Sequence, residues 1–274
     1  MIKIDIPEQL PSEIEAWKNK AAEITQEILL ATSLADKHAL IDKHEKHWRK
    51  PELVKWLSDL SCEKCWYTET KFGGDYQEVE HYRPKKGTKQ EDGTQPPDHN
   101  GYYWLAFDLT NYRLCKRRPN GKKGTFFPIL NERIRANNEN DPWQDETPLF
   151  LDPLKSNDIL LLSFDDTGLP VAEEGIGPDD IKRVNFTIEK YFLDERILNT
   201  RRQQTWNTTR ALFNNYLNAI TEANKSGSST MRASAEAELK QLRELVAPSA
   251  EFSSVAKASL LKLGDQMAMK IACN

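Results

Sequence analysis

The 274-residue sequence lacks any apolar run close to the roughly 20 residues that a membrane-spanning helix needs. Its first ten residues, MIKIDIPEQL, also lack the basic start and the apolar stretch of a secretory signal peptide. Charged residues make up 29% of the chain, which indicates a strongly polar surface. We therefore expect neither a membrane protein nor a secreted one, and we place the protein in the cytoplasm.

Cysteine is scarce, and several nucleotide-binding and hydrolase motifs are absent. Four cysteines in a chain without an export signal do not indicate a disulfide scaffold. A group of them would therefore be either a metal site or a grouping without function. The sequence contains no Walker loop, no Gly-x-Gly-x-x-Gly and no Gly-x-Ser-x-Gly. The sequence therefore contains none of these motifs for ATP binding, dinucleotide binding or serine-hydrolase chemistry.

The pattern along the chain predicts helices at both ends and an irregular middle. Ser12 and Glu15 form a capping pattern before a run of helical spacing, and Pro51 is placed to open a further helix. A strand-like run occurs at 149–151. Three regions follow: a helical region 1–60, an irregular module 61–130, and a mixed and then helical region 131–274. The predicted class is α+β, with a small module embedded between predominantly helical flanks.

Cys62 and Cys65 form a Cys-x-x-Cys pair at the end of a predicted helix. Such a pair can bind one zinc ion, but a structural zinc site needs four ligands. Cys115 is the nearest further cysteine, and a second Cys-x-x-Cys would end at position 118, where arginine stands. From the residues alone, this is either an occupied zinc knuckle or a former one that packing now holds.

Glu80 and His81 follow a short strand-like run. A carboxylate directly before a histidine lets one neighbour bind a metal ion while the other reaches a water molecule. A pair of this kind is also common on plain surfaces. Asn111 follows an aromatic run at 102–107, where its amide can hydrogen-bond neighbouring backbone and fix a loop.

Two basic clusters stand out in a chain of net charge −4. Six of the eleven residues at 113–123 are basic, and a second cluster, at 83–89, follows His81. The overall balance argues against a protein coated in nucleic acid, although it leaves room for a local basic patch. Either cluster alone would be a solvated loop, but both flank the same histidine and asparagines, which favours phosphate contacts.

In order along the chain, these features resemble the HNH (ββα-metal) endonuclease motif. The closer similarity is to the HNH nucleases found beside retrons and in Septu-type anti-phage systems. The similarity covers about residues 50–202 and is specific in the middle. The matching positions are the Cys62 and Cys65 pair, 80–85, 103–106, Asn111, Cys115 with Asn120, and 127–128.

The resemblance implies a metal-dependent endonuclease that cleaves phosphodiester bonds as the effector of an anti-phage system. Glu80 and the side-chain oxygen of Asn120 would hold one Mg²⁺ or Mn²⁺ ion, because these ions prefer oxygen donors. His81 would act as the general base, and Asn111 would orient its loop. Four basic residues would contact the nucleic-acid backbone: Arg83, Lys85, Arg117 and Lys122.

The implied partners are nucleic acid, with DNA favoured over RNA, and a separate ATPase, since this chain has no ATP-binding motif. The sequence departs from the family where Arg118 replaces the last cysteine, because guanidinium cannot be a zinc ligand. We therefore expect no structural Zn²⁺ at Cys62, Cys65 and Cys115. The departure also leaves an alternative function open, a catalytically degenerate HNH fold that serves as a nucleic-acid-binding or partner subunit.

Overall fold

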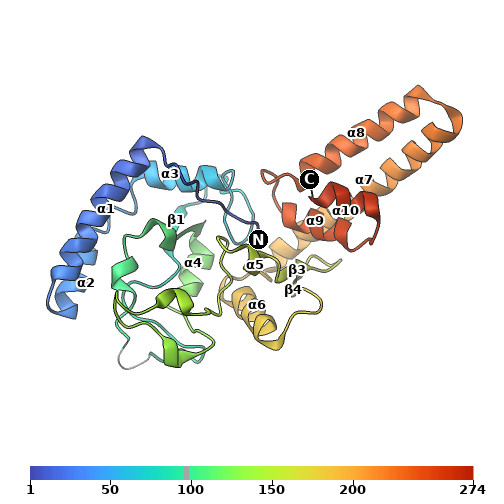
Figure 1. Ribbon diagram of the computed structural model, residues 1–274. Helices are drawn as coiled ribbons and strands as arrows, with labels where there is room; N and C mark the ends of the chain where they lie inside the picture. Colours follow the sequence, from blue (N-terminus) through green and yellow to red (C-terminus); the bar gives the residue numbers. More distant parts are fainter. Residues whose placement is uncertain (96–98, 274) are drawn as a thin grey trace.

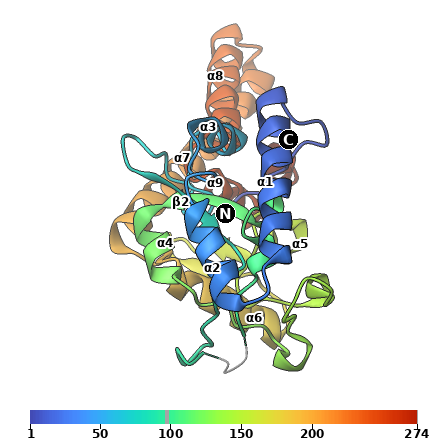
Figure 2. The ribbon, with the colours of Figure 1, turned by 90° about the vertical axis from the view of Figure 1, so that its left-hand side faces the viewer.

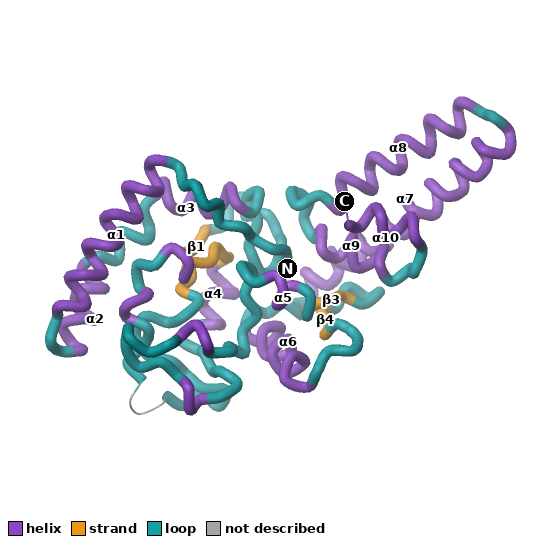
Figure 3. Tube along the Cα trace, in the orientation of Figure 1, coloured by secondary structure: helices purple, strands orange, loops and turns teal. Residues whose placement is uncertain are grey.

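The computed structural model describes residues 1–95 and 99–273. Helices dominate these residues, and the strands form two small antiparallel sheets (Figure 3), which confirms the predicted α+β class. The helices are α1 (Ser12–Leu30), α2 (Leu34–Lys43), α3 (Pro51–Leu60), α4 (Arg117–Lys123), α5 (Ser156–Ile159), α6 (Pro178–Lys190), α7 (Arg196–Ser226), α8 (Ser229–Val246), α9 (Ser253–Leu261) and α10 (Gln266–Cys273). The strands are β1 (Gln77–His81), β2 (Tyr112–Lys116), β3 (Leu162–Phe164) and β4 (Pro170–Ala172). Single 3₁₀ turns occur at Tyr103–Leu105, Leu109–Asn111, Glu132–Ile134 and Trp143–Asp145.

The N-terminal helices α1, α2 and α3 lie along one side of the central module (Figures 1 and 2). Ser33 caps α2 by accepting a hydrogen bond from the Asp36 amide at 3.1 Å. The region 1–60 was predicted to be helical, but α2 ends at Lys43 and the chain is not helical again until α3 begins at Pro51. The reason is a tertiary contact: the His47 ring stacks on Trp17 at 4.8 Å, and its carbonyl accepts the Trp17 indole N–H.

The central module is built on β1 and β2, which pair antiparallel. Glu80 stands opposite Arg113, and His81 stands opposite Tyr112. Helix α4 begins at the residue after β2 ends, and it packs against both strands. The order of these elements along the chain is therefore strand, strand, helix. The long connection between the strands passes through residues 82–111.

One hydrophobic core runs from Met1 to Leu193 and joins the N-terminal helices to the central module. The run at 149–151 lies in this core, but the prediction of a strand there is wrong. Its backbone amides donate hydrogen bonds to groups that do not belong to one neighbouring strand. The Leu149 amide donates to the Pro128 carbonyl, and the Leu151 amide donates to the Thr187 hydroxyl. A buried apolar run without a neighbouring strand therefore forms no ladder.

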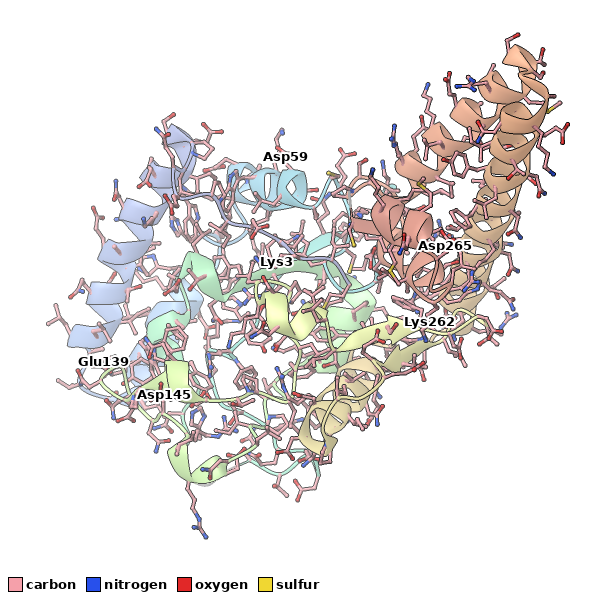
Figure 4. The ribbon with its side chains drawn as sticks, turned by 45° about the vertical axis from the view of Figure 1, so that its right-hand side comes forward. Lys3, Asp59, Glu139, Asp145, Lys262 and Asp265 are labelled. Carbon is pink, nitrogen blue, oxygen red and sulfur yellow. The ribbon has the colours of Figure 1, made fainter. Side chains whose placement is uncertain are left out.

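The C-terminal helices pack around a separate apolar cluster. Helices α7 and α8 form a hairpin that projects away from the rest of the chain (Figure 1). Gly227, at a φ of 70°, ends α7 in the left-handed conformation, and the Ser228 hydroxyl caps α8. Asp265 lies at the base of the hairpin (Figure 4), where its carboxylate caps α10. Within the described residues, no helix has the length and apolar character needed to cross a membrane.

Candidate functional site

A cleft of about 790 Å³, here called the His81 cleft, lies beside the end of β1. The N-terminal region supplies one wall through Trp48 and Asp42, and Asn120 of α4 contributes to another. Asp42 forms an ion pair with Lys86, which ties α2 to the loop that follows β1. That the N-terminal region shares the site was not predictable from the sequence, because this wall forms only through tertiary packing.

The His81 side chain is 8% exposed and keeps one ring nitrogen unprotonated. Its Nε2 lies 2.9 Å from the Ala106 carbonyl oxygen, which can only accept a hydrogen bond. Nε2 must therefore carry the proton of a neutral ring, and Nδ1 keeps its lone pair. The Trp48 ring meets the imidazole edge-on at 4.9 Å and fixes its orientation.

Lys85 places an ammonium group next to that lone pair, with Nζ 3.5 Å from Nδ1 of His81. Burial lowers the pKa of His81 well below its usual 6.5, and the charge of Lys85 lowers it further. Burial also lowers the pKa of Lys85, to about 8. Lys85 forms no ion pair with any carboxylate in the described part of the chain. The cleft thus holds a neutral imidazole beside an ammonium that lacks a counter-ion.

A close backbone contact fixes the loop that carries Lys85. Gly101, at a φ of +79°, lies so near this loop that a Cβ atom there would be 2.2 Å from the Gly87 nitrogen. The Tyr102 amide also donates to the Pro84 carbonyl at 2.8 Å. The position of Lys85 is therefore set by backbone contacts rather than by its own side chain.

Asn111 uses its whole side-chain amide on backbone groups. Its Oδ1 accepts from the Arg83 amide at 2.8 Å, and its Nδ2 donates to the carbonyls of Arg83 and Leu105 at 3.0 Å. The side chain joins the segment after His81 to the segment that precedes Ala106, the residue whose carbonyl holds the His81 ring. Asn111 does not line the cleft; it acts on His81 through the backbone.

Glu80 is 2% exposed and forms an ion pair with Lys123 of α4. The Lys123 ammonium also donates to the carbonyls of His81 and Tyr82, at 2.7 and 2.9 Å. Oε1 of Glu80 is the oxygen that faces the Lys123 ammonium, and Oε2 accepts from the Tyr67 hydroxyl at 3.5 Å. Both oxygens of this buried carboxylate thus already have a partner.

Asn120, the other predicted metal ligand, bonds to a different carboxylate. Its Nδ2 donates to Oε2 of Glu78 at 2.7 Å, and Glu78 lies on the same face of β1 as Glu80 because strand residues alternate. Glu78 was not among the residues predicted from the sequence. Its position two residues before Glu80 on a predicted strand was the pattern that could have placed it on the same face.

These donors fit a small hard cation. Mg²⁺ usually takes one or two carboxylates, completing its shell with water and substrate phosphate, and Asn120 adds an amide oxygen of the kind it accepts. Oε1 of Glu80 already faces the Lys123 ammonium, so a metal ion bound there would share this oxygen with Lys123. No group of three or more His, Cys, Asp or Glu residues in the described chain is arranged around one point. The fit therefore rests on Glu78, Glu80 and Asn120.

Arg83 was predicted to contact nucleic acid, but the structure buries its side chain. The side chain is 4% exposed and pairs with Glu146, and it also donates to the Trp143 carbonyl at 3.0 Å. Its guanidinium lies 5.0 Å from the ring centres of Tyr102 and Phe127. Arg83 thus links two loops and is not part of the exposed basic surface.

The structure separates the other predicted basic residues. Lys85 lines the His81 cleft, whereas Arg117 and Lys122 are exposed on α4. Lys122 lies 4.9 Å from the centre of the Phe192 ring, away from His81. The basic residues of the two sequence clusters therefore lie on two separate surfaces, one at the His81 cleft and one on α4.

The three cysteines do not assemble around one point. Cys65 and Cys115 are buried, whereas Cys62 is exposed at a φ of 53°. Burial raises the pKa of the Cys115 thiol well above its usual value, and neighbouring Cys65 raises it further. Arg118 turns away to lie over Phe192. The described residues show a buried cysteine pair, and the three-cysteine knuckle of the family pattern is not formed.

The chain is similar to a protein of an anti-phage defence system. The chain is 36% identical over 156 residues to the Septu protein PtuB of Bacillus mycoides (strain KBAB4). The match includes 56% of this chain and 50% of the relative, so the chain spans about half the length of the curated relative it matches. No protein-family model matches the chain. The similarity supports the Septu-type resemblance that the sequence motifs indicated.

Proposed function

We propose that the protein is a metal-dependent HNH endonuclease that cleaves phosphodiester bonds of nucleic acid, DNA above all, in anti-phage defence. The observation that carries this proposal is the His81 cleft, where a neutral imidazole keeps its Nδ1 lone pair 3.5 Å from the Lys85 ammonium, which forms no ion pair among the described residues. A general base needs a free lone pair, and a phosphate needs a cation. The cleft offers both at one place.

In this mechanism, Lys85 holds the scissile phosphate and Nδ1 of His81 takes the proton of the attacking water. The hydrogen bond from Nε2 to the Ala106 carbonyl keeps the ring oriented and favours the protonated ring that follows. Asn111 is a positioning residue, because it holds the backbone on both sides of that bond. Trp48 packs edge-on against the imidazole and helps to hold its orientation.

Glu80, Glu78 and Asn120 would hold the Mg²⁺ or Mn²⁺ ion that the resemblance implies. When bound, such an ion stabilises negative charge that develops on the phosphate and its leaving oxygen. The Lys123 ammonium holds the Glu80 side chain in place. This proposal assigns the carboxylates to metal binding and His81 to proton transfer.

The defence role is proposed from the similarity to a Septu protein. Because this chain contains no ATP-binding motif, we propose that any ATP hydrolysis belongs to a separate partner. The helices that flank the module, including the projecting α7–α8 hairpin, are where we place docking of that partner.

Nicking of supercoiled plasmid in Mg²⁺ or Mn²⁺ tests the proposed function, first with the protein alone and then with the product of the neighbouring gene. We expect cleavage by the wild type and a loss of roughly 10²- to 10⁴-fold in His81→Ala, the usual cost of removing a general base. His38→Ala, which changes a histidine on α2 outside the cleft, is the matched control. Cleavage by His81→Ala at the wild-type rate would contradict the proposal.

The Glu80–Lys123 pair favours a second candidate, a degenerate HNH fold that binds nucleic acid or a partner without cutting. A buried carboxylate already neutralised by an ammonium has less need of a metal ion. Binding of labelled DNA without nicking, in either metal and with the partner present, would support this candidate over the nuclease.

A further inference from the structure

A second groove, of about 710 Å³, is formed by the α4 residues that the His81 cleft does not use. We call it the Phe192 groove. Arg117 and Arg118 line it from α4, Thr70 lines it from the loop before β1, and Leu198 lines it from the start of α7. None of these residues takes part in the mechanism proposed above.

Two cations beside the Phe192 ring are unpaired. Arg118, which lines the groove, and neighbouring Lys122 form no ion pair in the portion of the chain that the structure describes. Arg117 is 79% exposed and forms an ion pair with Glu78 at 3.9 Å. Unpaired cations grouped at a concave surface attract an anionic ligand. Neighbouring Lys116 differs, because Asp75 pairs with it at 3.0 Å.

Phe192 gives the groove an aromatic surface in an uncommon backbone conformation. Its φ is 52°, the left-handed region that a bulky residue rarely adopts and that glycine usually takes at the end of a helix. The ring is partly exposed, with the Arg118 guanidinium carbon 4.8 Å and Lys122 Nζ 4.9 Å from its centre. A strained residue that keeps an aromatic ring at a basic groove indicates a ligand with a flat face.

We propose that the Phe192 groove binds an unpaired stretch of nucleic acid. The phosphates contact Arg117, Arg118 and Lys122, and a base stacks on Phe192 or on the guanidinium plane of Arg118. Unpaired bases expose the face that stacking needs, whereas a duplex hides it. The inference rests on the proposed function in that the bound strand is part of the substrate that enters the His81 cleft.

The test is fluorescence anisotropy of a labelled single-stranded oligonucleotide and of the matching duplex, with full-length His81→Ala protein so that no strand is cut. Phe192→Leu should weaken single-strand binding by about 5- to 150-fold, the range for loss of one stacked base. Phe192→Tyr, which keeps a ring, should retain the affinity. Arg232→Ala, on the exposed surface of α8, is the control and should change nothing.

The salt dependence supplies a second measurement. Arg118→Gln with Lys122→Gln should flatten the slope of log affinity against log salt by about 0.7 per lost contact on a single strand. Unchanged affinity in Phe192→Leu, or an equal loss on single strand and duplex, would overturn the inference. Affinity for an acidic peptide in place of the oligonucleotide would overturn it as well.

The two proposals can fail separately. If the wild type nicks plasmid but Phe192→Leu binds single strands normally, only the groove inference fails. If Phe192→Leu loses single-strand binding but the wild type never nicks, the groove inference stands and the nuclease proposal fails.

Discussion

Nζ of Lys85 lies 3.5 Å from Nδ1 of His81, and burial has lowered the pKa of both groups. Each therefore titrates at a lower pH than it would in water. His81 stays neutral through the physiological range, while Lys85, with a pKa of about 8, begins to lose its charge just above that range.

This pair predicts a bell-shaped dependence of cleavage on pH. The acid limb reports protonation of His81 and lies below pH 6.5, and the alkaline limb lies near pH 8, where Lys85 becomes neutral. Lys85→Met should cut the rate at pH 7 by roughly ten- to hundredfold, the value of one charged phosphate contact. It should also remove the alkaline limb and move the acid limb to higher pH. Initial nicking rates across this range measure both; an alkaline limb that survives the substitution would contradict the assignment.

Asn111→Ala should destabilise the protein and lower its activity together. The substitution leaves three buried backbone groups of Arg83 and Leu105 without their bonds, at a cost on the order of 3 kcal/mol in the free energy of unfolding. Asn140→Ala, on an exposed loop, is the matched control. Urea unfolding and plasmid nicking on the same preparations check the prediction, and a variant of wild-type stability would show that water replaces the amide.

The Glu80–Lys123 pair predicts an exchange between ammonium and metal ion. Lys123→Met leaves Glu80 buried without a partner, so the variant should lose about 3–5 kcal/mol of stability. If Glu80 is a metal ligand, Mn²⁺ should raise the melting temperature of this variant more than that of the wild type. Calorimetric titration with Mn²⁺ should also show weaker binding in Glu80→Gln and in Glu78→Gln. If Mn²⁺ raised the melting temperature of Lys123→Met and of the wild type equally, Glu80 would not be a metal ligand.

Buried His99 predicts a loss of stability in acid. Burial lowers its pKa from 6.5 to about 4, so the unfolded chain binds the proton more readily than the folded one. Stability from this group is complete above pH 6.5 and declines as the pH falls toward 4, with about 2 kcal/mol lost at pH 5. Unfolding free energies at pH 5 and pH 7 should differ less in His99→Gln than in the wild type. An unchanged difference would mean that other groups carry the acid sensitivity.

Features set by one local side chain were predictable from the sequence. Pro51 marks the start of α3 because a first-turn proline acts within one turn. The order of Glu80, His81 and Asn111 likewise predicted a shared site around β1 and β2.

Features that depend on a distant partner could not be predicted. Arg83 belongs to a basic run, and its partner Glu146 comes 63 residues later, so nothing near it in sequence indicates burial. Lys123 is similar, because its contact with Glu80 needs α4 to fold back on β1. Trp48 reaches the cleft only because the chain leaves the helix at Lys43.

The position of Trp48 gives the cleft an optical reporter of its own. The indole meets the His81 imidazole edge-on at 4.9 Å, and Nζ of Lys85 lies 4.9 Å from its ring centre. Indole emission responds to nearby charge, so a ligand that draws Lys85 away, or a proton that charges His81, changes the fluorescence of this one residue. The chain has seven tryptophans, so the signal is the difference between wild-type spectra and those of Trp48→Phe. Cleft occupancy can then be followed in solution without a label and without turnover.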